Sequence, residues 1–161
     1  MTRRESRENA FIAIFAASFG QEPCEALQAI RAEEEAMEPD AFGEGLVSLY
    51  QANHQAVNTQ IERYLKGWDV RRIQKVSLAI LRSSVAEMLF GEEKGMDSII
   101  INEAVELAKK YGDEKDFQFI NGLLGSVSRE KNTPVAPDGP VETLDGLTET
   151  PEDPAATPGE A

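Results

Sequence analysis

Residues 101–125, INEAVELAKKYGDEKDFQFINGLLG, decide the fold of this chain because they join two amphipathic segments through a short polar turn. Apolar residues recur at helical spacing over 101–111, and Gly112 is a typical helix stop. A second helix is expected over about 115–129, where one apolar stripe is formed by Phe117, Ile120, Leu124 and Val127. The stretch therefore predicts two consecutive helices that bury their apolar faces.

Phe119 does not belong to that apolar stripe. At about 100° per residue its side chain points roughly 120° away from the stripe, beside Lys115 and Gln118. An exposed aromatic next to a cation and an amide is suited to stacking on an unpaired base. The alternative is that Phe119 packs on a neighbouring helix in a multi-layer bundle, and the pattern alone leaves both interpretations open.

The residues before this stretch also have helical patterns. Alternating segments typical of strands do not occur, so the predicted fold class is all-α, with one domain over residues 1–131. Thr2, Pro23 and Asp69 are candidate helix starts, and Gly20 and Gly91 are candidate stops. The expected helices cover about 2–20, 23–30, 41–66, 69–91, 97–111 and 115–129.

Residues 132–161 have a different composition from the rest of the chain. They hold seven acids, no Lys or Arg, and six of the eight prolines. Such a segment cannot bury enough apolar surface to offset the entropy of ordering, so we expect a disordered acidic tail. It contributes about half of the formal net charge of −13, which weakens the usual argument that an acidic protein avoids nucleic acid. A solvated tail is favoured over one that competes with nucleic acid for basic residues.

Composition excludes several classes of protein. No apolar run is long enough to span a bilayer, and residues 1–20 lack the apolar block of a signal peptide, so we expect a cytoplasmic protein with no membrane partner. One histidine and one cysteine exclude the usual zinc ligand sets, and no cofactor is expected. Motifs for phosphate loops or activated nucleophiles are absent, which argues against an enzyme and predicts no catalytic residues.

The N-terminal arginines are the best candidates for binding. Arg3, Arg4 and Arg7 fall within about a 100° sector of the first helix, and Phe11 and Phe15 continue that stripe. Guanidinium groups neutralise phosphates and aromatic rings accept unstacked bases, so this pattern suits single-stranded RNA. The alternative is a solvated helix start followed by core phenylalanines, which we favour for Phe11. A second basic set is formed by Arg71, Arg72, Lys75 and Arg82.

Several motifs resemble those of the NusB family of bacterial transcription antitermination factors. The segment INEAVELAK at 101–109 is followed by Tyr111-Gly112, and FINGLL at 119–124 stands at the matching distance. The start resembles the family's arginine-rich N-terminus, and residues 68–89 resemble its central pattern through Trp68, Ile73, Ala79–Arg82 and Glu87–Leu89. The resemblance covers about residues 3–131.

The resemblance implies a fold of two packed helical subdomains and a function in transcription. Members bind boxA-like single-stranded RNA together with NusE, a small-subunit ribosomal protein, and join RNA polymerase complexes that read through ribosomal RNA operons. Carried onto this chain, RNA contacts fall to Arg3, Arg4, Arg7, Phe15, Arg82 and Phe119. A contact with NusE falls to Ser77, where relatives often have an acidic residue. The alternatives are an accessory domain related to ribosomal RNA methyltransferases and a helical scaffold that does not bind RNA.

Overall fold

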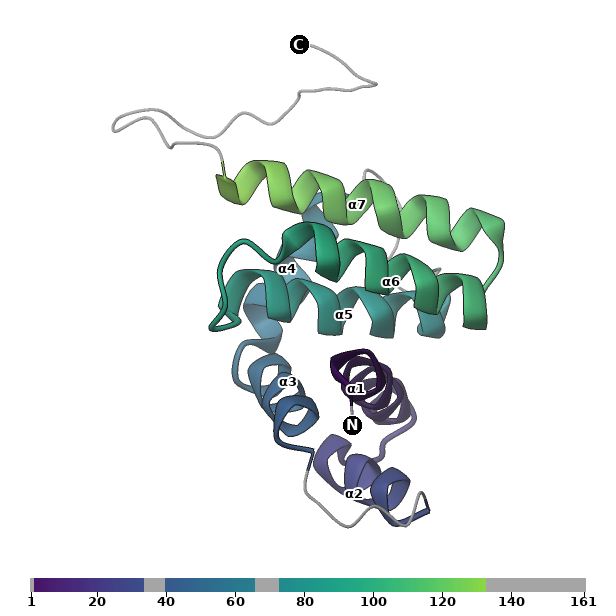
Figure 1. Cartoon of the computed structure of the whole chain (residues 1–161). Coiled ribbons are helices and arrows are strands. Elements are labelled where there is room, and N and C mark those ends of the chain that lie inside the picture. The colour runs from purple at the N-terminus through teal and green to yellow at the C-terminus, as the bar shows by residue number, and fades with distance from the viewer. Residues whose placement is uncertain (1, 34–39, 66–72, 133–161) are drawn as a thin grey trace, which may run out of the picture. The chain divides into compact units, whose positions relative to one another are not determined.

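The computed structural model describes residues 2–33, 40–65 and 73–132, and within these ranges the chain is helical without any strand. Figure 1 shows how these helices are arranged. The predicted all-α class is therefore confirmed. The helices are α1 (Arg3–Ala17), α2 (Pro23–Glu33), α3 (Ala41–Ala52), α4 (His54–Arg63), α5 (Lys75–Phe90), α6 (Asp97–Tyr111) and α7 (Glu114–Asn132).

Two hydrophobic clusters organise the helices into the two expected subdomains. The smaller cluster joins α1 to α2 and α3 through Ala10, Leu27 and Val47, among others. The larger cluster joins α1 to α4, α5, α6 and α7, and Ile14 and Ile80 lie in it. Because α1 contributes to both clusters, it lies between α2 and α3 on one side and the stacked helices α5, α6 and α7 on the other (Figure 1).

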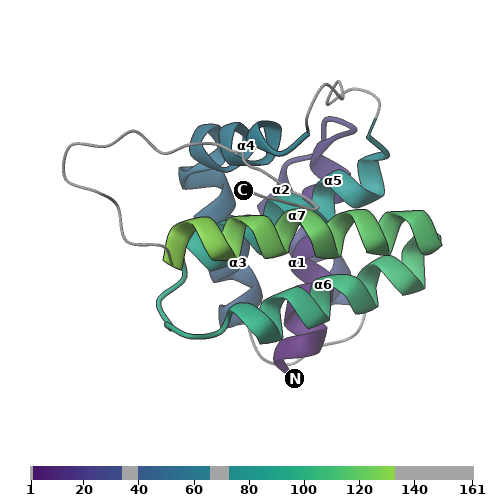
Figure 2. The same cartoon turned by 90° about the horizontal axis from the view of Figure 1, so that it is seen from above.

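The helix α5 is buried along most of its length. Figure 2 shows α7 and α6 crossing over α1, with α5 behind them. The buried residues of α5 include Leu78 and Ala79, which lie between Lys75 and Arg82 on the same helical face. Core residues therefore separate Lys75 from Arg82, and these two members of the second basic set do not form one solvated stripe.

The single helix expected over residues 41–66 is wrong, because the chain turns at Asn53. This residue leaves the helical conformation, with φ −124° and ψ 24°. Its side-chain amide donates to the Leu49 carbonyl at 2.9 Å, and its backbone N–H donates to the same carbonyl at 3.1 Å. Asparagine competes with the helix in this way for backbone groups, so α3 ends at Ala52 and α4 begins at His54.

The turn between α6 and α7 matches the sequence prediction closely. A Cβ at Gly112 would lie 2.6 Å from the Asp116 carboxylate, which explains why glycine stands there. Asp113 and Asp116 accept hydrogen bonds from each other's backbone N–H, at 3.1 and 2.9 Å. This reciprocal arrangement satisfies N–H groups at the start of α7.

Other predictions fall outside the described residues. They are the helix start at Asp69, the basic pair Arg71 and Arg72, and the tail from residue 133 onward. The helix α5 begins at Lys75, and the side chain of the preceding residue, Gln74, makes no capping hydrogen bond. The domain boundary at residue 131 stays a prediction.

Candidate nucleic-acid interface

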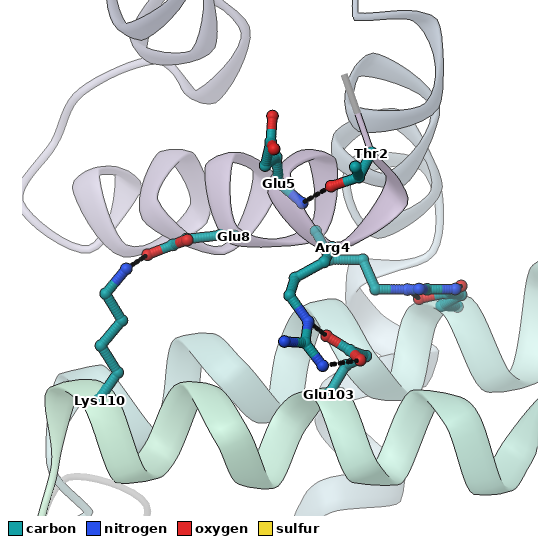
Figure 3. Close-up of polar contacts among 8 residues, drawn as sticks. Thr2, Arg4, Glu5, Glu8, Glu103 and Lys110 are labelled. Atoms are coloured by element: carbon teal, nitrogen blue, oxygen red, sulfur yellow. Dashed lines mark hydrogen bonds and ion pairs between the residues drawn. The ribbon is translucent and has the colours of Figure 1, made fainter.

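The first turn of α1 presents two exposed arginines on a capped helix end. The Thr2 hydroxyl accepts a hydrogen bond from the Glu5 backbone N–H at 3.1 Å, which fixes the start of the helix (Figure 3). The side chains of Arg3 and Arg4 are 51% and 65% exposed. Both arginines are therefore accessible to a phosphate group.

Each of these arginines already has a carboxylate partner from a distant part of the chain. Arg4 donates two hydrogen bonds to Glu103 of α6, at 2.8 and 3.0 Å (Figure 3). Arg3 donates to Glu93 at 2.6 Å, and its guanidinium lies 4.5 Å from the centre of the Phe42 ring. The hydrogen bond between Arg3 and Glu93 raises the pKa of the arginine and lowers the pKa of the glutamate.

Exposed ion pairs of this kind contribute little to stability, because water screens them and both side chains lose freedom. At Arg3, where both partners are exposed, exchange of the carboxylate for an RNA phosphate therefore gives up little folding energy. An RNA contact by Arg3 and Arg4 stays a prediction. An RNA phosphate that binds either arginine must displace the Glu93 or Glu103 carboxylate.

Arg7 occupies a different environment from the one expected for an RNA contact. Its side chain is 9% exposed and that of Glu87 on α5 is 10% exposed. The guanidinium donates through Nε to Oε1 at 3.0 Å and through Nη2 to Oε2 at 2.7 Å. This two-pronged pair ties α1 to α5 inside the molecule, and an RNA contact by Arg7 stays a prediction that its burial does not support.

A further polar contact ties α1 to the end of α6. The Glu8 carboxylate accepts a hydrogen bond from the Lys110 ammonium at 2.6 Å (Figure 3) and another from the Tyr111 hydroxyl. Burial raises the pKa of Glu8, but these two hydrogen bonds outweigh that effect and lower it overall. The N-terminal half of α1 thus has a row of charged contacts with α5, α6 and the loop between them.

Three phenylalanines form a row along the C-terminal half of α1 and the turn that follows it. The ring centres of Phe11 and Phe15 are 6.4 Å apart, and those of Phe15 and Phe19 are 5.1 Å apart. Phe11 is 2% exposed and belongs to the core, as favoured from the sequence, whereas Phe15 is half-buried. Phe19 is 65% exposed and was not identified from the sequence, although its spacing of four from Phe15 could have revealed it.

Arg82 lies on α5 and contacts residues of α3 and α4. Its Nε donates to the Asn58 side-chain oxygen at 2.9 Å, and its guanidinium lies 5.9 Å from the centre of the Tyr50 ring. Arg82 is half-buried, and within the described residues it has no carboxylate partner. Its charge is therefore less compensated than the charges of the N-terminal arginines.

The structure alters the expectations for Phe119 and Ser77. Phe119 is half-buried and packs against the larger hydrophobic cluster, as in the second of the two interpretations left open by the sequence, and a role in RNA contact stays a prediction. It makes no ring contact with Phe15 among the described residues. Ser77 is 2% exposed, and its hydroxyl has no hydrogen-bond partner among the described residues. Because Ser77 is buried, it offers a partner protein almost no accessible surface. A contact between Ser77 and NusE stays a prediction that this burial does not support.

The site therefore combines accessible cations with a partly exposed aromatic row on one helix. Arg4 and Phe15 are separated by about 16 Å along α1, at 1.5 Å per residue, while Arg82 and Phe119 lie on other helices. Over residues 2–33, 40–65 and 73–132, no cluster of His, Cys, Asp or Glu could hold a metal ion. In the same ranges no helix has the length and hydropathy to cross a bilayer. The arrangement can bind phosphate and stack on bases.

Comparison with known proteins identifies the family. The NusB family model matches residues 4–129. The transcription antitermination protein NusB of Bacillus licheniformis is 37% identical over 131 residues, covering 81% of this chain and 98% of that protein. The NusB protein of Heliobacterium modesticaldum is 39% identical over 132 residues, covering 81% of this chain. This chain spans 64% of the length of that relative, which is less than two thirds.

A solved structure gives the same result for the fold. One chain in the crystal structure of antitermination factors NusB and NusE in complex with double-stranded RNA superposes on this chain with a TM-score of 0.70. The two chains are 27% identical, and the match covers 81% of this chain and 99% of the other. With the family model and the relatives, this superposition leads to one conclusion: the chain belongs to the NusB family.

Proposed function

We propose that this protein is a transcription antitermination factor that binds boxA-like single-stranded RNA together with NusE. The complex would join RNA polymerase and promote read-through of ribosomal RNA operons, in the cytoplasm. The observation that carries the proposal is the shared fold with a NusB chain that has been solved with NusE and RNA. The protein acts in this proposal by binding and not as an enzyme.

The described side chains support RNA as the ligand in a specific way. Arg3 can exchange its carboxylate for a phosphate at little cost to stability, because Arg3 and Glu93 are both exposed. Arg4 is exposed too, but its partner Glu103 is only 14% exposed, so the same exchange costs more there. Phe15 offers part of its ring for stacking, next to the exposed Phe19. Arg82 supplies a cation that no described carboxylate neutralises. Phe119 can stack on a base only through the exposed part of its half-buried ring.

The proposal is tested by titrating a boxA-type RNA with the chain alone and with NusE. We expect tighter binding in the presence of NusE, and a dependence on salt that reports the number of phosphates contacted. Replacing Arg3 or Arg4 by Gln should lower the slope of log affinity against log salt by about 0.7 for each lost phosphate contact on single-stranded RNA.

A matched control is available at the end of α4. Arg63 forms a surface ion pair with Glu130 at 2.6 Å and is 44% exposed, much like Arg3. Arg63→Gln should leave the salt slope unchanged. Absence of RNA binding at moderate salt, with or without NusE, would overturn the proposal, and binding of NusE alone would identify a protein scaffold.

A further inference from the structure

Phe19 is the most exposed large apolar side chain among the described residues, at 65%. It stands immediately after α1, in a turn with defined hydrogen bonds. The Gly20 N–H donates to the Ala17 carbonyl at 3.0 Å, and the Gln21 N–H donates to the Ala16 carbonyl at 3.3 Å. Gly20 has φ +92°, and this combination is the Schellman ending of a helix. The backbone therefore holds Phe19 in one place, and its exposure is not the result of a frayed end.

The ring of Phe19 continues the aromatic row of α1 toward solvent. It meets Phe15 edge to face, with ring planes at 75° and centres 5.1 Å apart. Exposure rises along the row from the buried Phe11 through the half-buried Phe15 to Phe19. A ligand that stacks at Phe15 would therefore reach Phe19 as the next aromatic surface.

A cation accompanies this ring. The Lys75 ammonium, at the start of α5, lies 5.2 Å from the centre of the Phe19 ring. Lys75 is exposed, and it has no carboxylate partner within the described ranges. Arg3, Arg4, Arg7 and Lys110 are all paired with glutamates. The positive charge at Phe19 is thus free to attract a phosphate without displacing an acid.

We infer that Phe19 and Lys75 form an additional stacking position for one unpaired RNA base and its phosphate, next to Phe15. This inference deepens the proposed function and rests on it. When a base covers the ring, the ammonium leaves the ring face and pairs with the adjoining phosphate. Base stacking and a phosphate contact then replace one exposed cation–aromatic contact, which is a weak interaction.

The experiment compares RNA affinities of Phe19 variants in complex with NusE. Phe19→Ala removes the ring, Phe19→Tyr keeps an aromatic face, and Phe19→Leu keeps an apolar side chain without one. We expect binding to weaken at least about fivefold for the Ala and Leu variants and to stay near wild type for Tyr. Lys75→Gln should lower the salt slope by about 0.7.

Phe90→Ala is the matched control. Phe90 is 37% exposed and ends α5, whereas Lys75 begins it, so the two positions are about 22 Å apart along the helix. Thermal unfolding followed by circular dichroism verifies that each variant is folded. RNA shortened one nucleotide at a time should reach a length at which Phe19→Ala binds as well as the wild type, and that length locates the base.

Different outcomes separate this inference from the proposed function. If the wild-type complex binds no RNA, the proposed function fails and the stacking position fails with it. If the wild type binds and Phe19→Ala binds equally well, only the stacking position is refuted. It is also refuted if the Leu variant binds as well as Tyr, or if Phe19→Ala weakens binding of NusE measured without RNA and leaves the RNA affinity of the preformed complex unchanged.

Discussion

Replacement of Arg7 by Met is expected to destabilise the chain strongly. The side chains of Arg7 and Glu87 are about nine-tenths buried, and their closest contact is 2.7 Å. Loss of Arg7 alone leaves the Glu87 carboxylate desolvated and unpaired, which costs about 3–5 kcal/mol in comparable buried pairs. Against a total stability of about 5–15 kcal/mol, this is a large fraction.

The paired replacement should behave differently from either single one. Met at both positions removes the two charges together and fills a similar volume, so the double variant is expected within about 1 kcal/mol of wild type or more stable. Urea unfolding followed by circular dichroism measures all four free energies of unfolding. Arg3→Met is the surface control, since Arg3 and its partner Glu93 are 51% and 53% exposed and its loss should cost little stability.

Two results would refute this reasoning. One is an Arg7→Met variant as stable as Arg3→Met, because the pair of Arg7 and Glu87 would then not be desolvated. The other is a folded double variant that binds RNA tenfold more weakly than wild type at low salt. Arg7 would then contact RNA, as the sequence pattern predicted, and the internal role assigned from its burial would be wrong.

The remaining predictions concern three other positions. Ser77→Ala should raise the free energy of unfolding by about 1 kcal/mol, because it removes a buried hydroxyl without a partner, and should leave NusE affinity unchanged in a titration. Phe119→Ala should lower stability by about 1–2 kcal/mol in urea unfolding, because the ring is half-buried against the core. Glu8 has a lowered pKa in the folded chain, so its contribution is present above the unfolded value of 4.5 and is lost as pH falls through the folded one. Acid titrations of stability should be flatter below pH 4.5 in Glu8→Gln than in wild type.

The sequence could predict the features that depend on local spacing. The helices on either side of Gly112 are where the apolar periodicity put them, and Ala104, Ala108, Ile120 and Leu124 are buried. Periodicity works here because the most deeply buried residues of each helix lie on one apolar face. It failed for residues 41–66, where a single asparagine redirects the chain without changing the apolar pattern.

The candidate site depended more on tertiary contacts, which spacing does not reveal. Arg7 and Glu87 are 80 residues apart in the chain, so nothing in the N-terminal pattern distinguishes Arg7 from Arg3 and Arg4. For Phe119, the angle to one apolar stripe left a surface position and a packed position equally open. A helix that contacts more than one neighbour buries more than one stripe, and this explains the half-buried ring.

The partners of Arg3 and Arg4 determine how readily each arginine can turn to RNA. Arg4 is the more exposed arginine, but its partner Glu103 is only 14% exposed, whereas Glu93 beside Arg3 is 53% exposed. If Arg4 moves to a phosphate, Glu103 loses its cation in a place that water reaches poorly. Glu93 is hydrated when Arg3 leaves, so the exchange at Arg3 gives up less free energy. The exposure of the partner therefore outweighs the exposure of the arginine, and Arg3→Gln should weaken RNA binding more than Arg4→Gln.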